Sequence, residues 1–230
     1  WYCEYMNLAI ILSAGIGSRM KTNLPKQFIE INNKPLFIYT LEKFNIDEIN
    51  QIILVINQDY KDLYITYLNK FPINKDIKLV IGGSTRQESV NNALQKISCN
   101  DFDIVLIHDG ARPLIEKKTI INNIETCKIY KTPVITITNI VDTIIDKDYN
   151  LLDRNKLLSV QTPQTFMFYQ INKLHQKALK DNLINISDDG QLAKKYGLNI
   201  KYVNGSRLNF KVTEKDDIKL FELLLKEGEK

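Results

Sequence analysis

Short apolar runs alternate along most of the chain with segments whose apolar positions recur every three or four residues. The runs are four or five residues long and rich in Ile, Val and Leu, as strands buried on both faces of a parallel sheet require. This rhythm predicts an α/β fold with a doubly wound, mostly parallel (Rossmann-like) sheet, whose ligands bind beyond the carboxyl ends of the strands. The predicted strands cover residues 8–12, 52–56, 77–81, 104–107 and 134–137, and the predicted helices between them cover residues 35–44, 60–70, 87–97 and 117–130.

The rhythm breaks after residue 137. Two extended pieces flank a polar loop, and we predict that residues 138–160 form a projecting β-arm with no place in the parallel sheet. Helices are predicted over residues 166–179, 187–196 (capped by Ser187) and 214–226, with a strand over residues 200–203. We expect one domain over residues 6–230. Residues 1–5 are interpreted as a remnant that precedes the natural start at Met6.

Composition excludes several classes of function. The 31 basic and 27 acidic residues are interspersed and leave a net charge of +4, so no basic stripe predicts nucleic-acid binding. Three separated cysteines form no CxxC pair, and two histidines are too few for a histidine-based zinc site. No apolar run approaches the roughly 20 residues that cross a bilayer. We therefore expect a cytoplasmic protein with no membrane partner.

The first predicted strand runs into a glycine-bearing loop. Its sequence is SAGIGSRM over residues 13–20, followed by LPKQ over residues 24–27. Small residues let backbone N–H groups close around phosphate oxygens, and Arg19 and Lys26 add positive charge. The loop lacks both the GxGxxG and the GxxxxGK[ST] fingerprint. Alone, its glycines indicate no more than a tight turn; the two basic residues favour phosphate binding.

Two glycines follow the third predicted strand. Gly82 and Gly83 permit a flat ligand such as a base to approach the backbone closely. These residues alone favour a plainer interpretation, in which Ser84 or Thr85 caps the next helix and Arg86 lies on the surface.

The fourth predicted strand ends at Asp109. A carboxylate at the ligand edge of a sheet needs solvent, an ionic partner or a metal, and Mg²⁺ takes one or two carboxylates together with phosphate oxygens. The alternative is a salt bridge from Asp109 to Arg112 in a turn that ends at Pro113. We interpret His108 as a packing or hydrogen-bonding residue.

Nine segments together resemble the 2-C-methyl-D-erythritol 4-phosphate cytidylyltransferases of isoprenoid precursor synthesis. They follow the order and spacing of that family over residues 9–218, almost the whole chain. The segments are AIILSAGIGSRM, LPKQF, GGSTRQESV, IHDGARPLI, VDTI, DR, QTPQTF, SDDGQLAKKYG and LNFKVTEKDDI.

The resemblance implies a site for CTP and a magnesium ion (Mg²⁺) bound by Asp109. It implies that Arg19 and Lys26 stabilise the charge that develops at the α-phosphate. The residues implied to hold the triphosphate are Ala14, Gly15, Gly17, Ser18, Arg19 and Lys26, and those implied to recognise cytosine are Gly82, Gly83 and Ser89.

The resemblance also implies a homodimer. In the family the arm crosses to a second subunit, so Thr143 and Arg154 would serve the neighbour's site. The residues implied to surround the sugar phosphate and the phosphates near it are Arg112, Thr143, Arg154, Thr162 and Lys211, the last with a catalytic role.

Three alternatives differ in acceptor or in class. A ribitol-5-phosphate cytidylyltransferase shares the phosphate loop, but the HDGARP segment and Asp153-Arg154 favour methylerythritol phosphate as the acceptor. A nucleotide-sensing or scaffold protein that had lost the chemistry would lack some of the charged positions, which are all present here. An NAD-dependent oxidoreductase would carry the missing glycine fingerprint.

Overall fold

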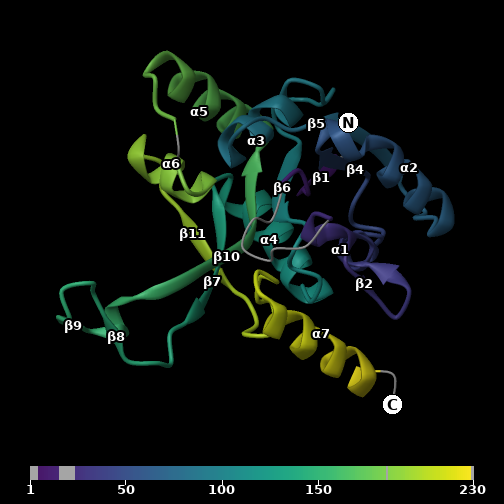
Figure 1. Cartoon of the computed structure of the whole chain (residues 1–230). Coiled ribbons are helices and arrows are strands. Elements are labelled where there is room, and N and C mark those ends of the chain that lie inside the picture. Colours follow the sequence, from purple (N-terminus) through teal and green to yellow (C-terminus); the bar gives the residue numbers. More distant parts are fainter. Residues whose placement is uncertain (1–4, 16–23, 185, 229–230) are drawn as a thin grey trace.

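A seven-stranded sheet forms the centre of the protein, and helices cover both of its faces (Figure 1). The computed structural model describes residues 5–15, 24–184 and 186–228, so most of the predicted remnant 1–5 lies outside the described residues. The strand order is β11-β7-β10-β6-β1-β4-β5. In chain order the strands are β1 (Asn7–Leu12), β4 (Gln51–Ile56), β5 (Asp76–Ile81), β6 (Ile104–Asp109), β7 (Val134–Asn139), β10 (Leu158–Met167) and β11 (Lys201–Asn204).

The sheet is mostly parallel, as predicted. Strands β6, β1, β4 and β5 pair in parallel, and β11 pairs in parallel with β7. Side chains alternate across β1: Ala9 and Ile11 join the hydrophobic core on one face, and Leu8 and Ile10 join the core on the other. Because both of their faces are buried, the central strands β1, β4 and β6 each contain a continuous apolar run.

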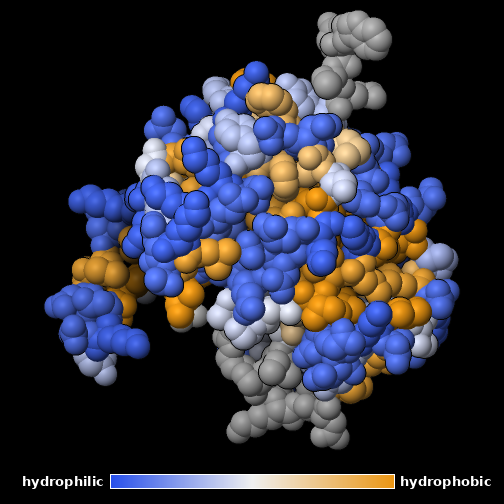
Figure 2. Space-filling view, turned by 90° about the horizontal axis from the view of Figure 1, so that it is seen from above, coloured by the Kyte–Doolittle hydropathy of each residue, from blue (hydrophilic) through white to orange (hydrophobic). Residues whose placement is uncertain are grey.

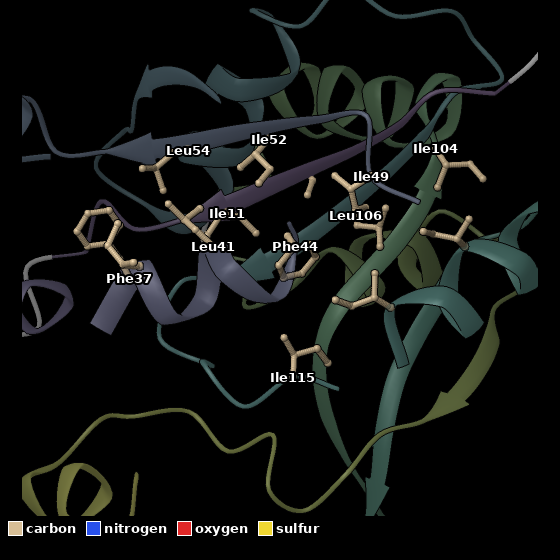
Figure 3. Close-up of a cluster of buried hydrophobic side chains, with 14 of the residues drawn as sticks. Ile11, Phe37, Leu41, Phe44, Ile49, Ile52, Leu54, Ile104, Leu106 and Ile115 are labelled. Carbon is tan, nitrogen blue, oxygen red and sulfur yellow. The ribbon is translucent and has the colours of Figure 1, made fainter. Parts of the chain in front are cut away.

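Two layers of helices enclose the sheet. One face packs against α1 (Leu36–Lys43), α2 (Lys61–Lys70) and α4 (Lys117–Tyr130). The other packs against α3 (Arg86–Leu94), α5 (Phe168–Lys180) and α6 (Asp189–Lys195). Figure 3 shows the core on the first face, where Phe37 and Leu41 of α1 and Phe44, the C-cap of that helix, lie against the strand side chains.

A third, smaller core holds the C-terminal segment against the domain. The last helix, α7 (Lys215–Gly228), packs Phe221 edge-on against Tyr39, with ring centroids 5.1 Å apart. The short antiparallel pair β2 (Glu30–Ile31) and β3 (Lys34–Pro35) contributes Ile31 to the same core.

Among the described residues, no helix is both long and apolar enough to cross a membrane.

Strand β10 corrects two of our predictions. We gave residues 157–160 no place in the sheet and began a helix at residue 166. Instead β10 continues from Leu158 to Met167, lies antiparallel between β6 and β7, and ends where α5 begins. Its register with β7 shifts between Val160 and Gln164, which accommodates Pro163 inside the sheet.

The predicted arm is a hairpin built on the ends of β7 and β10. Its base is continuous with the main sheet, because Asn139 pairs with Leu158. Its tip is the antiparallel pair β8 (Ile144–Ile145) and β9 (Leu151–Leu152), which stands away from the domain in Figure 1. The arm is therefore an extension of two strands of the main sheet, β7 and β10.

The helix cap at α6 also differs from the prediction. Asp188 caps this helix, because its Oδ1 accepts a hydrogen bond from the backbone nitrogen of Gln191 at 2.9 Å. The Ser187 hydroxyl instead lies 3.2 Å from the other carboxylate oxygen of Asp188. Either residue type is a good N-cap, and the chain enters the helix one residue later than we expected.

Candidate active site

A cavity of about 480 Å³ opens at the carboxyl edge of the parallel strands, within the size range of small-molecule sites. Its walls come from the ends of β1, β4, β5 and β6, from the one-turn 3₁₀ helix η2 (Lys26–Phe28) and from the segment before α7. The lining residues are Leu12, Ser13, Ala14, Gly15, Lys26, Gln27, Asn57, Gly83, Ser84, Thr85, Arg86, Ser89, Asp109, Gly110, Ala111, Lys211 and Thr213.

The loop after β1 is fixed at its beginning. The Ser13 backbone nitrogen donates to the carbonyl of Val55 at 2.8 Å, and the Tyr64 hydroxyl donates to the Ser13 carbonyl at 2.6 Å. Ala14 and Gly15 follow and line the cavity. The other residues predicted for this loop, Gly17, Ser18 and Arg19, lie outside the described residues.

Two glycines follow β5, and each allows a close approach that a side chain would block. A Cβ on Gly82 would lie 2.6 Å from the Cβ of Ala14, and a Cβ on Gly83 would lie 2.2 Å from Cγ of Glu88. The Gly83 N–H donates to the Ser89 hydroxyl at 3.0 Å. Gly82 is therefore required by the contact between the two loops, and Gly83 by the close approach of Glu88 from α3. Gly83 and Ser89, though not Gly82, line the cavity.

The predicted cap of α3 is also present. The Thr85 hydroxyl accepts from the backbone nitrogen of Glu88 at 3.0 Å. Capping by Thr85 and a ligand-facing role for its neighbours are compatible, because the cap fixes the loop that carries Gly83.

Asp109 ends β6 and is surrounded by cations. Its Oδ2 lies 3.0 Å from Nζ of Lys211 and 3.3 Å from Nε of Arg112, and its Oδ1 lies 3.8 Å from Nε of Arg86. Burial alone would raise the pKa of this carboxyl, but Lys211, Arg86 and Arg112 outweigh it and hold the pKa well below its usual range. Asp109 is therefore ionised at neutral pH. The predicted salt bridge to Arg112 is present as one of three.

Arg86 is a site residue that the sequence did not reveal. We assigned it to the surface, but its side chain is mostly buried, lines the cavity and pairs with Asp109 and Asp189. The sequence feature that could have indicated this role is the position of Arg86 directly after the helix cap Thr85. A side chain at that position begins close to the carboxyl edge of the sheet. A single arginine after a cap is too common to be read this way.

Two lysines from distant parts of the chain reach the cavity. Lys26 lies on η2 and donates a hydrogen bond from Nζ to the carbonyl of Val212 at 2.7 Å. Val212 in turn donates its N–H to the carbonyl of Ala111 at 2.8 Å, which binds the C-terminal segment to the loop after β6. Lys26 and Lys211 thereby line the same cavity as Asp109.

Thr162 and the arm residues do not line the cavity. Thr162 is 4% exposed and lies behind Asp109, whose backbone N–H it accepts at 3.1 Å. Thr143 and Arg154 are exposed on the arm, where Arg154 donates a hydrogen bond to the carbonyl of Val141. Within one chain, the structure does not bring the arm residues to Asp109.

The described part of the chain holds no cluster of three or more His, Cys, Asp or Glu side chains that could bind a metal ion. Asp109 is the ionised carboxylate in the cavity wall, and a single carboxylate fits magnesium only when other oxygen ligands accompany it. The surrounding guanidinium and ammonium groups suit an anionic ligand. The arrangement can thus bind a phosphate-bearing molecule and neutralise its charge.

Comparisons with known proteins agree with this geometry. The sequence model of the 2-C-methyl-D-erythritol 4-phosphate cytidylyltransferases matches residues 7–227. The chain is 38% identical to a protein of that name from Clostridium novyi, with 95% of this chain and 96% of the relative covered. It is 35% identical to a ribitol-5-phosphate cytidylyltransferase from Lacticaseibacillus paracasei, with 97% and 100% covered.

A solved structure extends the likeness to the fold. The 4-diphosphocytidyl-2C-methyl-D-erythritol synthase of Anaerococcus prevotii superposes with a TM-score of 0.82 at 29% identity, with 96% of this chain and 99% of that chain covered. The family model, the sequence relatives and the overall structure thus lead to the same assignment. The chain belongs to the 2-C-methyl-D-erythritol 4-phosphate cytidylyltransferase family, which consists of nucleotidyltransferases.

Proposed function

We propose that this protein transfers a cytidylyl group from CTP to 2-C-methyl-D-erythritol 4-phosphate and releases pyrophosphate. The product is 4-diphosphocytidyl-2-C-methyl-D-erythritol, an isoprenoid precursor of the non-mevalonate pathway. One observation carries the proposal: in a chain of this family, Lys26 and Lys211 line one cavity with Asp109 at the carboxyl edge of the sheet.

The chemistry needs no general base. An anionic phosphate oxygen of the acceptor attacks the α-phosphorus of CTP, a new P–O bond forms, and the bond to pyrophosphate breaks on the opposite side. The obstacle is repulsion between two polyanions. Lys26 and Arg19 offset the charge that develops at the α-phosphate, and Lys211 and Arg112 offset that of the acceptor.

Asp109 is the residue we propose to hold Mg²⁺. Its carboxylate is ionised and lines the cavity, and Lys211, whose side chain is 38% exposed, has room to move from it toward a phosphate. When bound, the ion would neutralise charge on the phosphate oxygens. Ala14 and Gly15 would approach the triphosphate, and Gly83 and Ser89 the cytosine, with Gly82 keeping the two loops in contact.

We further propose a homodimer in which the arm reaches the site of the partner. Exposed apolar side chains gather on the arm between its polar tip and the domain (Figure 2), a pattern typical of interaction surfaces. Thr143 and Arg154 would then complete the acceptor site of the second subunit. The large hydrophobic side chains exposed on the arm and at its base are those of Val141, Ile145, Tyr149, Leu151, Leu152, Leu158 and Val160. We propose the cytoplasm as the compartment.

The acceptor is tested directly by pyrophosphate release from CTP. Methylerythritol phosphate and ribitol 5-phosphate are supplied at matched concentrations, because relatives with each name are similar to this chain. We expect faster turnover of methylerythritol phosphate. If ribitol 5-phosphate were turned over faster, the protein would still be a cytidylyltransferase, but its acceptor would be ribitol 5-phosphate. If neither acceptor were turned over, the proposal would be overturned.

A further inference from the structure

A chain of buried charges runs from the cavity wall into the helical layer behind it. Asp189, in the first turn of α6, is 2% exposed, and its Oδ2 accepts a hydrogen bond from Nη1 of Arg86 at 2.7 Å. Its Oδ1 accepts from Nε2 of His175 on α5 at 2.9 Å. His175 is 1% exposed. No step of the proposed reaction uses Asp189 or His175.

The carboxylate of Asp189 is charged despite its burial. Burial alone would raise the pKa of this group, but Arg86 and His175 outweigh that effect and lower the pKa to about 2. Burying an ionised carboxylate is strongly unfavourable unless its partners are well placed. Two directed hydrogen bonds satisfy that condition, so both oxygens of Asp189 are fixed.

Arg86 is divided between two carboxylates. It makes a short, direct hydrogen bond to Asp189 at 2.7 Å and a longer ion pair to Asp109 at 3.8 Å. Its Nη2 is buried and has no hydrogen-bond partner among the described residues. If Asp189 lost its charge, the nearest carboxylate for this guanidinium would be Asp109.

We propose that Asp189, supported by His175, is a positioning residue that holds the Arg86 guanidinium in the cavity wall and away from close contact with Asp109. The carboxylate of Asp109 then stays available to the magnesium nucleotide, and Arg86 stays beside the phosphates. The identity of that ligand rests on the proposed function. The pair acts through Arg86 and touches neither substrate.

The test compares the affinity of purified variants for CTP in the presence of Mg²⁺, measured by titration calorimetry. Asp189→Asn keeps the shape of the side chain and removes its charge. We expect the Kd for CTP to rise by about 10- to 100-fold, because small displacements of a positioned charge have effects of this size. The KM for CTP should rise with it. The expected change in kcat is smaller.

A second pair of variants separates positioning from packing. His175→Gln retains an N–H donor for Asp189, and His175→Met has similar length and no donor. We expect His175→Gln to bind CTP nearly as the wild type does, and His175→Met to bind several-fold more weakly. The matched control is Asp103→Asn. Asp103 is also 2% exposed and accepts the backbone N–H groups of Met6 and Asn100, but it lies at the opposite end of β6.

Equal CTP affinity in the wild type and Asp189→Asn, with a lower Tm as in Asp103→Asn, would overturn the inference. If Asp189→Asn does not fold, the two His175 variants decide, and equal affinity between them would overturn it. If the wild type turned over neither acceptor, the proposed function would fail. Binding of magnesium pyrophosphate to the same variants would still decide the inference.

Discussion

The hydroxyl of Thr162 lies 3.0 Å from Nδ1 of His108, directly behind Asp109. The same hydroxyl oxygen accepts the backbone N–H of Asp109, and its own hydrogen is available for donation to Nδ1. On the other side of the ring, Nε2 lies 3.1 Å from the carbonyl of Arg112 and donates to it. These partners assign a neutral imidazole with its hydrogen on Nε2. The ring also packs on Phe44, with centroids 4.9 Å apart.

This environment predicts that His108 destabilises the fold in mild acid. Burial lowers the pKa of His108 to about 4, against 6.5 in the unfolded chain. Between these values the unfolded chain binds a proton that the native protein does not, so stability falls as the pH falls from 6.5 to 4. The slope from this one group reaches about 1.4 kcal/mol per pH unit.

Denaturant titrations of the wild type and His108→Gln across this pH range measure the effect. Glutamine keeps a donor and an acceptor and does not titrate, so the variant should lose less stability on acidification. His175 is present in both proteins, so any contribution it makes to the pH dependence of stability is the same in both and cancels. Parallel curves for the two proteins would show that the pKa of His108 is the same in the folded and the unfolded chain, and would contradict this prediction.

Substitution by alanine should affect stability at Gly82 and CTP binding at Gly15. A Cβ on Gly15 would meet no atom of the described residues within 4 Å, whereas one on Gly82 would lie 2.6 Å from the Cβ of Ala14. We expect Gly82→Ala to lower the free energy of unfolding by about 1–3 kcal/mol, as overpacking does. We expect Gly15→Ala to keep the stability of the wild type and to weaken CTP binding. Unfolding curves and calorimetry separate the two effects, and unchanged CTP affinity in Gly15→Ala would remove this position from the phosphate site.

Lys26 should matter for turnover more than for stability. Its Nζ binds the carbonyl of Val212 in the present structure, and loss of that bond costs about 1 kcal/mol of stability. Loss of a contact that offsets transition-state charge costs about 3–4 kcal/mol of activation free energy, or roughly 10²–10³ in kcat. We therefore expect Lys26→Ala to remain folded and to lose turnover by that factor.

Lys34→Ala is the matched control for Lys26. Lys34 lies eight positions later and pairs with Glu42 at 2.7 Å, outside the cavity lining. It should turn over CTP as the wild type does. Comparable losses in both variants, or near-normal turnover in Lys26→Ala, would exclude Lys26 from the chemistry.

The sequence predicted the parallel half of the fold because burial on both faces leaves a continuous apolar signature. Residues 8–12 and 104–107 are such runs, and each lies within an observed strand. The carboxyl ends of these strands then located the site. Lys26, Asp109 and Lys211 were assigned by resemblance, and the fold brings all three to one cavity.

Strand β10 was not predicted because many of its buried residues, on both faces, are polar: Gln161, Thr162, Gln164 and Thr165. Gln164 accepts the N–H of Gly190 and donates to Asp188, and Thr165 donates to Asn123. Such side chains are buried only because partners from other elements satisfy them, and those partners are distant in sequence. Arg86 was missed for the same reason: Asp189, which keeps it buried, lies 103 residues away.

The proposed shared site makes a prediction that needs no structure of the dimer. If Arg154 on the arm completes the partner's site, Arg154→Ala should lose turnover, although Arg154 is exposed and far from Asp109 within its own chain. Lys26→Ala should also be inactive, since Lys26 lies in the cavity of its own chain. The two inactive proteins carry their defects in different halves of the site.

Mixing them should restore activity. In a mixed dimer, the chain with Arg154→Ala keeps Lys26 in its own cavity and receives an intact Arg154 from the arm of its partner, so one site of the two is complete. Random exchange of subunits makes about half of the dimers mixed, so recovery should approach roughly a quarter of wild-type activity. The controls are each variant mixed with itself, which should stay inactive. If the mixed sample showed no recovery although mass spectrometry detected mixed dimers, Arg154 would act within its own chain and the crossing arm would be excluded, because only a site shared between subunits is complemented in this way.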